Sequence, residues 1–329
     1  MMLDFVRHRL DELATGVFLL LVAIVTVLHP PVFATPGGLL LARVVLWSAA
    51  VLVAVLLVAG RFSSRAQKLL HSVLAFAPIV VAVVGYVSLR LLHAHAITAW
   101  LGIPSLDRWA MDADVAIFGK TPYLWFSHGA LGSNLFLLIM SWFYALYPLT
   151  PILALAWFRF RRDASQFSLV QRAMIISLYC GYCCYLLIPV AGPLSLARPA
   201  SPNFLESTLV YSFLAGNFRY AYDCFPSLHT ANPWIIAWLS RGRLPRWLMA
   251  AAIVAACGIT LSTVALEVHY GVDVLAGLAW VFLIVPLARA TLPRKQAPDS
   301  AAAGPSSEKC DHAVASRCHT AASKRCAHW

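Results

Sequence analysis

Positions 222–229 read YDCFPSLH, and positions 269–277 read HYGVDVLAG. Between them lie two apolar segments joined by the basic turn RGR at 241–243, and a third apolar segment follows. Ionisable residues are rare in segments that cross a membrane and usually mark a functional site there. The sequence therefore directs attention to His229 and His269, each of which opens an apolar segment.

Composition indicates a membrane protein. Of the 329 residues, 60% are hydrophobic and only 12% are charged, whereas about a quarter of the residues in a soluble domain are charged. The net charge of +11 could indicate nucleic-acid binding, but the basic residues form short clusters between apolar runs, as in cytoplasmic loops. The sequence therefore predicts an all-α, polytopic membrane helical bundle that binds no nucleic acid.

Eight apolar runs have roughly the length that a helix needs to cross a bilayer, about 17–25 residues, although the sixth is short. The first run lacks a clear small-x-small cleavage site, so we predict a retained anchor rather than a signal peptide. The runs cover residues 13–33, 39–59, 71–92, 134–157, 173–191, 226–240, 246–266 and 270–290.

Eight crossings place the connecting loops alternately on the two sides of the membrane. An excess of Lys and Arg marks the cytoplasmic side, so both termini of this cell- or inner-membrane protein are predicted to be cytoplasmic. The cytoplasmic side receives 15 basic residues: Arg7, Arg9, Arg61, Arg65, Lys68, Arg159, Arg161, Arg162, Arg172, Arg241, Arg243, Arg246, Arg289, Arg294 and Lys295. The other side receives six: Arg43, Arg90, Arg108, Lys120, Arg198 and Arg219.

This topology places His229, His269 and Arg198 at the same extracytoplasmic face, although they are far apart in the sequence. Two long segments lie on this side. Residues 93–133 contain several tryptophans, which favour the headgroup region of a bilayer. Residues 192–225 are rich in Pro, Ser and Asn and are predicted to form a lid or substrate loop.

His269 and Asp273 have the spacing of an interacting pair. If the eighth span is helical from about residue 268, positions i and i+4 lie on one face, and the carboxylate can accept a hydrogen bond from one imidazole nitrogen. That bond would fix the tautomer and leave the other nitrogen as a nucleophile, as in hydrolase triads. The alternative is a histidine at a helix start with a solvated carboxylate nearby.

His229 follows a predicted helix start, because Pro226 suits the first turn of a helix and Ser227 is a good cap. Backbone N–H groups at such a start bind anions, so a phosphate could lie against Ser227 and Leu228. His229 could then give a proton to a leaving oxygen. The alternative is a capping proline and serine, with His229 extended toward water.

Arg198 could clamp phosphoryl oxygens through its guanidinium group, although an outer-loop arginine is more often solvated or bound to headgroups. Arg219 is a second candidate. No obvious carboxylate cluster could hold Mg²⁺, but Asp107, Asp112 and Asp114 are close enough in the sequence to keep that alternative open.

Two motifs carry a resemblance to a known family. FPSLHTA at 225–231 and HYGVDVLAG at 269–277 are similar to the second and third motifs of the type 2 phosphatidic acid phosphatase superfamily, in the forms of its inositol phosphorylceramide synthase-like branch. DVAIFG at 114–119 is similar to an Asp-x-x-x-Phe-Gly segment ahead of the core in that branch. The resemblance covers about residues 100–290 and implies a six-helix phosphatase-like core within the bundle.

The resemblance implies a metal-independent phosphotransfer through a phosphohistidine. His269 would be the nucleophile, Asp273 would orient it, and His229 would be the general acid and then the general base. Arg198 would match the end of the first motif. The implied phosphate-binding residues are Arg198, Ser227 and Leu228.

Two positions depart from the superfamily pattern. The lysine that opens the first motif, seven residues before its arginine, is Ala191 here. The arginine often found six residues before the third-motif histidine is Thr263. Two phosphate-binding cations are thus missing, which weakens an assignment to a generic phosphatase.

Three parts are expected along the chain: N-terminal spans in residues 1–92, a membrane catalytic domain of the superfamily type in residues 93–292, and a disordered cytoplasmic tail in residues 293–329. The tail contains cysteines and histidines that could bind a metal, but no Cys-x-x-Cys spacing supports a site. We therefore predict no metal and no cofactor. The tail residues concerned are Cys310, His312, Cys318, His319, Cys326 and His328.

Three functions are compatible with these features. The first is a phosphotransferase, similar to inositol phosphorylceramide synthase and thus acting in sphingolipid metabolism, that moves a phospho-headgroup between lipids or polyols. The second is a lipid phosphate phosphatase, which uses the same residues with water as the acceptor. The third is a transporter or non-catalytic scaffold, but transporters carry interrupted helices with charges near mid-bilayer, and these spans are nearly free of charge.

Overall fold

All regular elements among the described residues are helical. The computed structural model describes residues 75–91, 98, 102–126, 133–196 and 221–292, all within the first of two units into which the chain divides, residues 1–293 and 294–329. The helices are α4 (Ala77–Leu91), α6 (Asp107–Phe118), the 3₁₀ helix η2 (Pro122–Trp125), α7 (Asn134–Leu146), α8 (Leu149–Phe160), α9 (Ala164–Leu187), α10 (Pro193–Leu196), α13 (Leu228–Leu239), α14 (Arg246–Ala265) and α15 (Gly271–Thr291).

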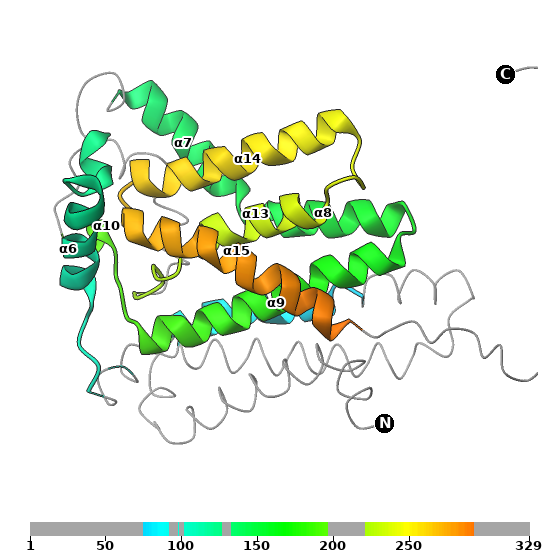
Figure 1. Ribbon diagram of the computed structural model, residues 1–329, viewed down its shortest axis with the longest axis horizontal. Coiled ribbons are helices and arrows are strands. Elements are labelled where there is room, and N and C mark those ends of the chain that lie inside the picture. The colour runs from blue at the N-terminus through cyan, green and yellow to red at the C-terminus, as the bar shows by residue number, and fades with distance from the viewer. Residues whose placement is uncertain (1–74, 92–97, 99–101, 127–132, 197–220, 293–329) are drawn as a thin grey trace, which may run out of the picture. The chain divides into compact units, whose positions relative to one another are not determined.

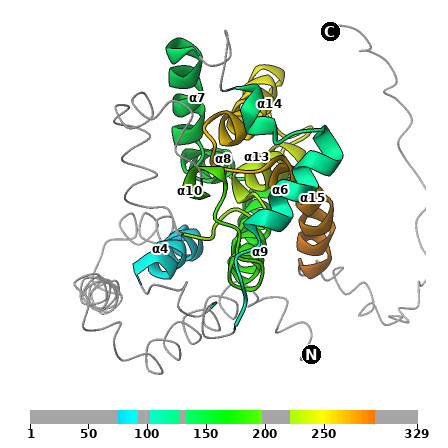
Figure 2. The same ribbon diagram turned by 90° about the vertical axis from the view of Figure 1, so that its left-hand side faces the viewer.

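Helix α13 lies at the centre of the bundle. It packs against α15, α14, α9 and α8, and Figures 1 and 2 show these helices arranged around it. Nine of its twelve residues are buried, as expected for a helix that is apolar on all sides. Its side chains Ile235, Ile236 and Leu239 join the main apolar core, which also takes residues from α4, α8, α9 and α15.

A second apolar cluster lies between α7 and the end of α14. It contains Leu137 and Met140 of α7 together with Leu266 and Val268 of the loop that follows α14. Glycine allows the two helices to approach, because a Cβ at Gly258 would lie 2.3 Å from the ring of Phe143. This cluster fixes the loop that leads into α15.

Among the described residues, three helices, α9, α14 and α15, are long and apolar enough to cross a membrane. Helices α7 and α8 would provide a fourth span together, but they are bent by 49° at their break. The break contains Pro148, the N-cap of α8, and proline removes a backbone donor from a continuing helix. The predicted span at 134–157 is therefore a bent pair of helices.

The sixth predicted span, residues 226–240, corresponds to α13, which has only 12 residues. Such a helix is about 18 Å long, short of the roughly 30 Å hydrocarbon core of a bilayer. The start of α13 lies inside the bundle, because Leu228 packs against Gly181 of α9, before the end of that helix at Leu187. The first two predicted spans, 13–33 and 39–59, lie outside the described residues, so the count of eight remains a prediction.

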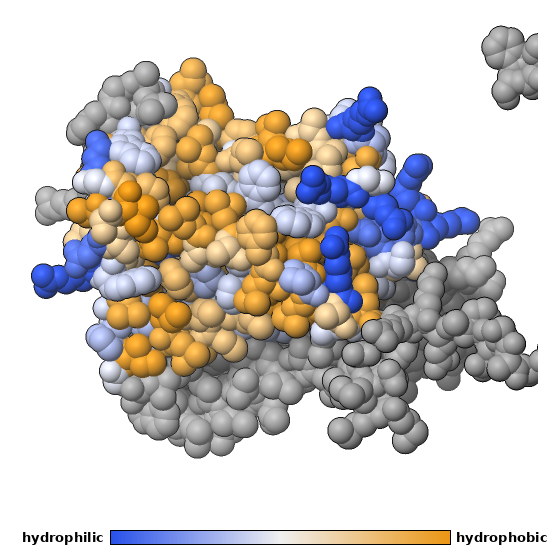
Figure 3. All heavy atoms as spheres, in the orientation of Figure 1, coloured by the Kyte–Doolittle hydropathy of each residue, from blue (hydrophilic) through white to orange (hydrophobic). Residues whose placement is uncertain are grey.

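The end of the bundle opposite α6 is hydrophilic. Figure 3 shows hydrophilic side chains gathered there, whereas apolar side chains cover much of the face between the two ends. Arg161, Arg241 and Arg243 are exposed at this end. Arg172, which the sequence analysis placed in a loop, is instead a buried residue of α9, and its guanidinium donates to the Thr291 carbonyl at the end of α15.

Candidate active site

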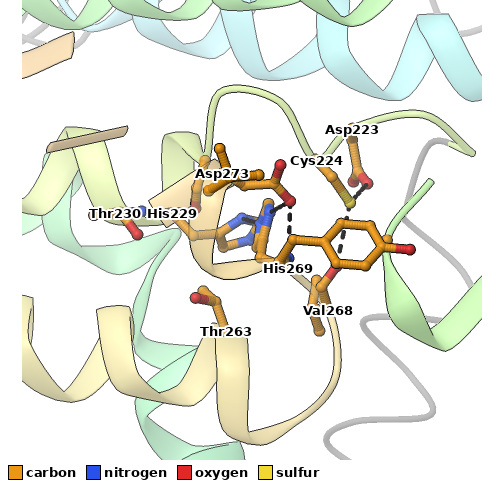
Figure 4. A network of polar contacts seen from close by, with 12 residues as sticks. Asp223, Cys224, His229, Thr230, Thr263, Val268, His269 and Asp273 are labelled. Carbon is orange, nitrogen blue, oxygen red and sulfur yellow. Dashed lines mark hydrogen bonds and ion pairs between the residues drawn. The ribbon is translucent and has the colours of Figure 1, made fainter. Parts of the chain in front are cut away.

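His269 lies in the loop between α14 and α15 (Figure 4). Helix α15 begins at Gly271 with Tyr270 as its N-cap, in agreement with the predicted run 270–290, but the condition of a helix from about residue 268 is not met and His269 precedes the helix. The Tyr270 N–H donates to Asp273 Oδ2 at 2.9 Å, which turns the carboxylate back over the helix start. His269 Nδ1 then lies 3.5 Å from Asp273 Oδ2, and neither side chain is exposed.

The pairing of His269 and Asp273 therefore has a different cause from the one predicted. Asp273 is the third residue of α15, where the positive end of the helix dipole favours a negative charge. The separation of 3.5 Å exceeds that of a well-formed N–H···O hydrogen bond. It still places the carboxylate where it can stabilise positive charge on the imidazole.

His229 is the second residue of α13. Ser227 is the N-cap and its hydroxyl accepts the Thr230 N–H at 3.3 Å, as the sequence predicts for a cap, whereas Pro226 precedes the cap and is not in the first turn. The ring of His229 contacts two aromatic rings, one from the last turn of α7 and one from the break between α7 and α8. Its centroid lies 4.9 Å from that of Tyr144 and 4.2 Å from that of Tyr147.

The two imidazoles meet. His269 Nε2 lies 3.4 Å from His229 Nδ1, and the ring centroids are 5.5 Å apart. A backbone hydrogen bond from the Ser227 N–H to the Asp273 carbonyl, 3.0 Å long, joins the two motifs. Gly277 permits this approach, because a Cβ there would lie only 2.5 Å from the Ser227 carbonyl oxygen.

This geometry gives the two nitrogens of His269 different neighbours. Nδ1 faces Asp273, and Nε2 faces His229. An imidazole oriented by a carboxylate through one nitrogen can use the other as a nucleophile, and a second imidazole beside it can move a proton. The arrangement is thus suited to a covalent transfer assisted by general acid–base catalysis.

A buried polar chain supports the ring environment of His229, and the sequence analysis missed it. Asn232 Nδ2 donates to the Tyr147 hydroxyl at 3.0 Å, and the Ser177 hydroxyl donates to Asn232 Oδ1 at 2.6 Å. Trp280 Nε1 donates to the Ser177 hydroxyl at 3.2 Å. The signal was available, because Asn232 is a polar residue within an apolar run, one turn after the histidine.

The aspartates considered as a magnesium site do not converge. Asp112 is exposed, whereas Asp107 and Asp114 are buried. Asp114 accepts the N–H groups of Gly271 and Val272 at 2.9 Å and 2.7 Å. Burial raises the pKa of Asp114 above its ordinary value, although these two N–H groups lower it. The carboxylate of Asp114 thus caps a helix.

Asp107 binds a different backbone segment. It accepts the Ala191 N–H at 3.1 Å and the Gly192 N–H at 2.9 Å. Ala191 occupies the position of the first-motif lysine and is buried. At the other departure from the superfamily pattern, Thr263 is also buried, and its carbonyl accepts the His269 N–H at 3.0 Å. Both positions hold uncharged, packed residues.

Cys224 is a neighbour of the site that the sequence analysis did not consider. Cys224, His269 and Asp273 each bring one possible ligand atom within 4.8 Å of the others, and all three are buried. The Cys224 thiol donates to the Val268 carbonyl at 3.2 Å. A thiolate, an imidazole and a carboxylate form a donor set that suits zinc, but here each lies among protein partners.

Other predicted residues are placed as follows. Arg198 and Arg219 lie outside the described residues, as does the tail with its cysteines and histidines. Leu228 is 3% exposed, and its side chain packs against α9, where a Cβ at Gly181 would lie 2.6 Å from it. Phosphate binding by Arg198, Ser227 and Leu228 stays a prediction.

Comparison with protein families matches residues 109–287 to the PAP2 superfamily. The match covers more than half of the chain and includes most of α6, both histidine motifs and most of α15. No curated protein and no solved structure matches the chain. From the family match and the apolar helices we conclude that the chain belongs to the PAP2 superfamily and is an integral membrane phosphatase or phosphotransferase.

Proposed function

We propose that this protein is a phosphotransferase that moves a phospho-headgroup from a phospholipid to the hydroxyl of another lipid or a polyol. The reaction passes through a phosphohistidine at His269. One observation carries the proposal: His269 Nε2 lies 3.4 Å from the ring of His229, while its Nδ1 lies 3.5 Å from the Asp273 carboxylate. A nucleophile, its orienting group and a proton donor thus lie together.

In the first half of the reaction, Nε2 of neutral His269 attacks phosphorus and forms a P–N bond. The P–O bond to the leaving alcohol breaks, and protonated His229 gives its proton to the departing oxygen. Asp273 stabilises the positive charge that develops on the ring of His269. The result is a phosphohistidine, a released alcohol and a neutral His229.

In the second half, the hydroxyl of the acceptor gives its proton to His229 while its oxygen attacks phosphorus. The P–N bond breaks, and the electron pair returns to His269. Both histidines regain their starting states. Phosphate oxygens would be bound at the start of α13 by Ser227 and Leu228, where backbone N–H groups favour an anion, and by Arg198.

The two histidines are too close to hold a phosphoryl group between them in this state. Nucleophile and general acid act on opposite sides of phosphorus, and their nitrogens are only 3.4 Å apart. We expect the His229 ring to shift when substrate binds, because it is partly exposed whereas His269 is fully buried. Catalytic contacts often reach their final geometry only in the substrate complex.

Burial of the nucleophile favours an alcohol over water as the acceptor. His269 and Asp273 have no exposed surface, and a site that excludes water protects a reactive intermediate from hydrolysis. The neutral residues Ala191 and Thr263, at positions where the superfamily carries cations, also argue against a generic phosphatase.

We place the site on the extracytoplasmic face, with both termini in the cytoplasm. Arg108 on α6 is exposed, but the other exposed arginines of the described residues, Arg161, Arg162, Arg241, Arg243, Arg246 and Arg289, belong to the opposite end of the bundle, and basic residues favour the cytoplasmic side. Hydrophilic side chains gather at that end (Figure 3). Cysteine labelling from either side of sealed vesicles tests this, using a cysteine introduced at Asp112. If this cysteine is labelled only from the cytoplasmic side, the proposed orientation is wrong.

The function is tested with the purified protein, a panel of phospholipids labelled with ³²P in the headgroup, and a mixture of lipid and polyol acceptors. Chromatography should reveal a new labelled phosphodiester, which is absent with His269→Ala. Release of inorganic phosphate alone would overturn the transferase in favour of a lipid phosphate phosphatase. Lipid mass spectrometry of membranes with and without the protein then identifies donor and acceptor.

A further inference from the structure

The first turn of α15 is completed by a residue from another helix. A helix leaves its first N–H groups without intrahelical partners, and Asp114 of α6 accepts two of them, from Gly271 and Val272. Asp114 is fully buried and lies 157 positions before Gly271 in the chain. The turn that it completes also carries Asp273 and directly follows His269.

The contact between α6 and α15 leaves little room for movement. A Cβ at Gly271 would lie 2.5 Å from the Phe118 ring, 2.7 Å from Pro122 and 3.1 Å from the Asp114 carboxylate. The end of α6 and the start of η2 therefore close directly over the backbone of Gly271. Glycine is required here because any side chain would push α6 away from α15.

Three consecutive N–H groups at this helix start are divided between two carboxylates. Asp273 accepts the Tyr270 N–H, whereas Asp114 accepts those of Gly271 and Val272. Without Asp114, the two orphaned donors would compete for the carboxylate in their own turn, that of Asp273. Asp273 would then be drawn away from His269.

We propose that Asp114 is a positioning residue for the reaction. By satisfying the N–H groups of Gly271 and Val272, it leaves the Asp273 carboxylate turned toward His269 and fixes the loop that carries the nucleophile. This inference rests on the proposed phosphohistidine step. It assigns α6 a role in catalysis, through Asp114, in addition to packing against the bundle.

The other buried aspartate of α6 strengthens the inference. Asp107 binds the N–H groups of Ala191 and Gly192, and the Leu106 N–H donates to the Pro189 carbonyl at 2.8 Å. Helix α6 thus holds two segments, the start of α15 and the backbone that leads toward Arg198. A shift of α6 would disturb both.

The test compares Asp114→Asn with Asp112→Asn in the full-length protein. Asp112 lies on the same helix and is exposed, so its replacement removes the same charge without touching α15. Both variants and the wild type are mixed with ³²P-phosphatidic acid in one series and with ³²P-phosphatidylinositol in a second series. Each reaction is quenched within milliseconds. The amplitude of the phosphohistidine burst counts competent sites, and its rate reports the chemical step at each of them.

We expect the burst rate of Asp114→Asn to fall about 10- to 100-fold, the cost of a nucleophile displaced by a fraction of an ångström to 1 Å. KM should stay near the wild-type value, and Asp112→Asn should match the wild type. If Asp114→Asn does not fold, Asp114→Ser, which keeps one acceptor and leaves space for a water, replaces it. A wild-type burst rate in whichever variant folds would overturn the inference.

A smaller amplitude with an unchanged rate would also overturn it, because Asp114 would then serve folding alone. Absence of a burst in the wild type with both lipids and with every other donor of the labelled panel would overturn the proposed function, and this inference with it. A wild-type burst combined with unaffected variants would overturn only the role of Asp114. The two failures are therefore distinguishable in one experiment.

Discussion

At the hydrophilic end of the bundle, buried polar side chains donate to the ends of helices. At the other end some polar side chains also cap helices, but His229, His269 and Asp273 in addition lie next to one another. At the first end, Gln166 Nε2 donates to the Leu239 carbonyl at 2.6 Å, and Arg172 donates to the Thr291 carbonyl. Each bond satisfies an acceptor that a helix terminus leaves unpaired. The fold alone therefore accounts for these buried polar residues, because each one completes the end of a helix.

The histidine end does not reduce to helix capping. His269 lies 3.4 Å from His229 and 3.5 Å from Asp273; both distances are longer than those of well-formed hydrogen bonds, and His269 and Asp273 are fully buried. Placing ionisable groups in this way costs stability, and such clusters are concentrated at functional sites. A buried polar side chain therefore does not by itself indicate a functional site. Several ionisable side chains held close together inside the protein do.

The largest expected effect is that of His269→Ala. Removal of the proposed nucleophile should lower lipid turnover by about 10⁴-fold or more and abolish phosphohistidine labelling. Gln166→Leu at the opposite end is the matched control, and should lower the melting temperature while leaving the labelling rate per folded molecule unchanged. Full lipid conversion by His269→Ala, or a defect only in solute flux, would favour a transporter or scaffold.

Asp273→Asn should have the next largest effect, a loss of about 10²- to 10⁴-fold in kcat. The amide oxygen can still accept the Tyr270 N–H, so the fold should survive, but it cannot stabilise a cationic His269. Asp163→Asn provides the control, because Asp163 is the N-cap of α9 at the opposite end. Steady-state kinetics and a thermal melt of both variants separate a loss of catalysis from a loss of stability. Wild-type turnover in Asp273→Asn would show that this carboxylate takes no part in the mechanism.

The sequence alone predicted much of this comparison. It yielded the helical class, the helix start at Ser227 and the pair His269 and Asp273, since these depend on apolar run length, on capping chemistry and on two short motifs. It also grouped the basic residues at one side. Such features are local, or follow from counting crossings.

Contacts between distant segments could not be predicted in the same way. Spacing alone suggested a helix from residue 268, but α15 begins at Gly271 because Asp114 and Asp273 satisfy its first N–H groups. The three nearby aspartates of α6 left a metal site open as an alternative, but Asp107 and Asp114 bind separate backbone segments and Asp112 is exposed. Tyr147 reaches His229 because the helix breaks before Pro148, a signal that was visible but not used.

Tyr147 offers a finer test, because it contributes both a ring against His229 and a hydroxyl that accepts from Asn232. Tyr147→Phe keeps the ring and should lower kcat less than about fivefold, whereas Tyr147→Ala should lower it about tenfold or more, since small displacements of catalytic groups are costly. Steady-state kinetics with the donor identified above measure both. Equal effects of the two substitutions would show that the hydroxyl, rather than the ring, supports His229.

The smallest expected effect is that of Asp163→Asn, a substitution at the hydrophilic end of the bundle. Although partial burial opposes ionisation, the Gln166 N–H, the Ser165 hydroxyl and Arg243 lower the pKa of Asp163 below its ordinary 3.8. A carboxyl whose folded pKa is depressed contributes stability above its unfolded pKa and loses it as the pH falls through the folded value. The melting temperature of Asp163→Asn should therefore be lower than that of the wild type at pH 7. This gap, the difference between the two melting temperatures, should disappear below about pH 4.

The size of that gap is limited, because asparagine is nearly as good an N-cap as aspartate and the pair with Arg243, 3.2 Å long, is partly exposed. Such pairs are worth about 0.2–1 kcal/mol, so the difference in melting temperature should be a few degrees at most and should shrink in high salt. Differential scanning fluorimetry in detergent across this pH range measures it. A gap that widens on acidification would mean that Asp163 is strained rather than stabilised in the fold, and any change in kcat at pH 7 would show that the two ends of the bundle are coupled.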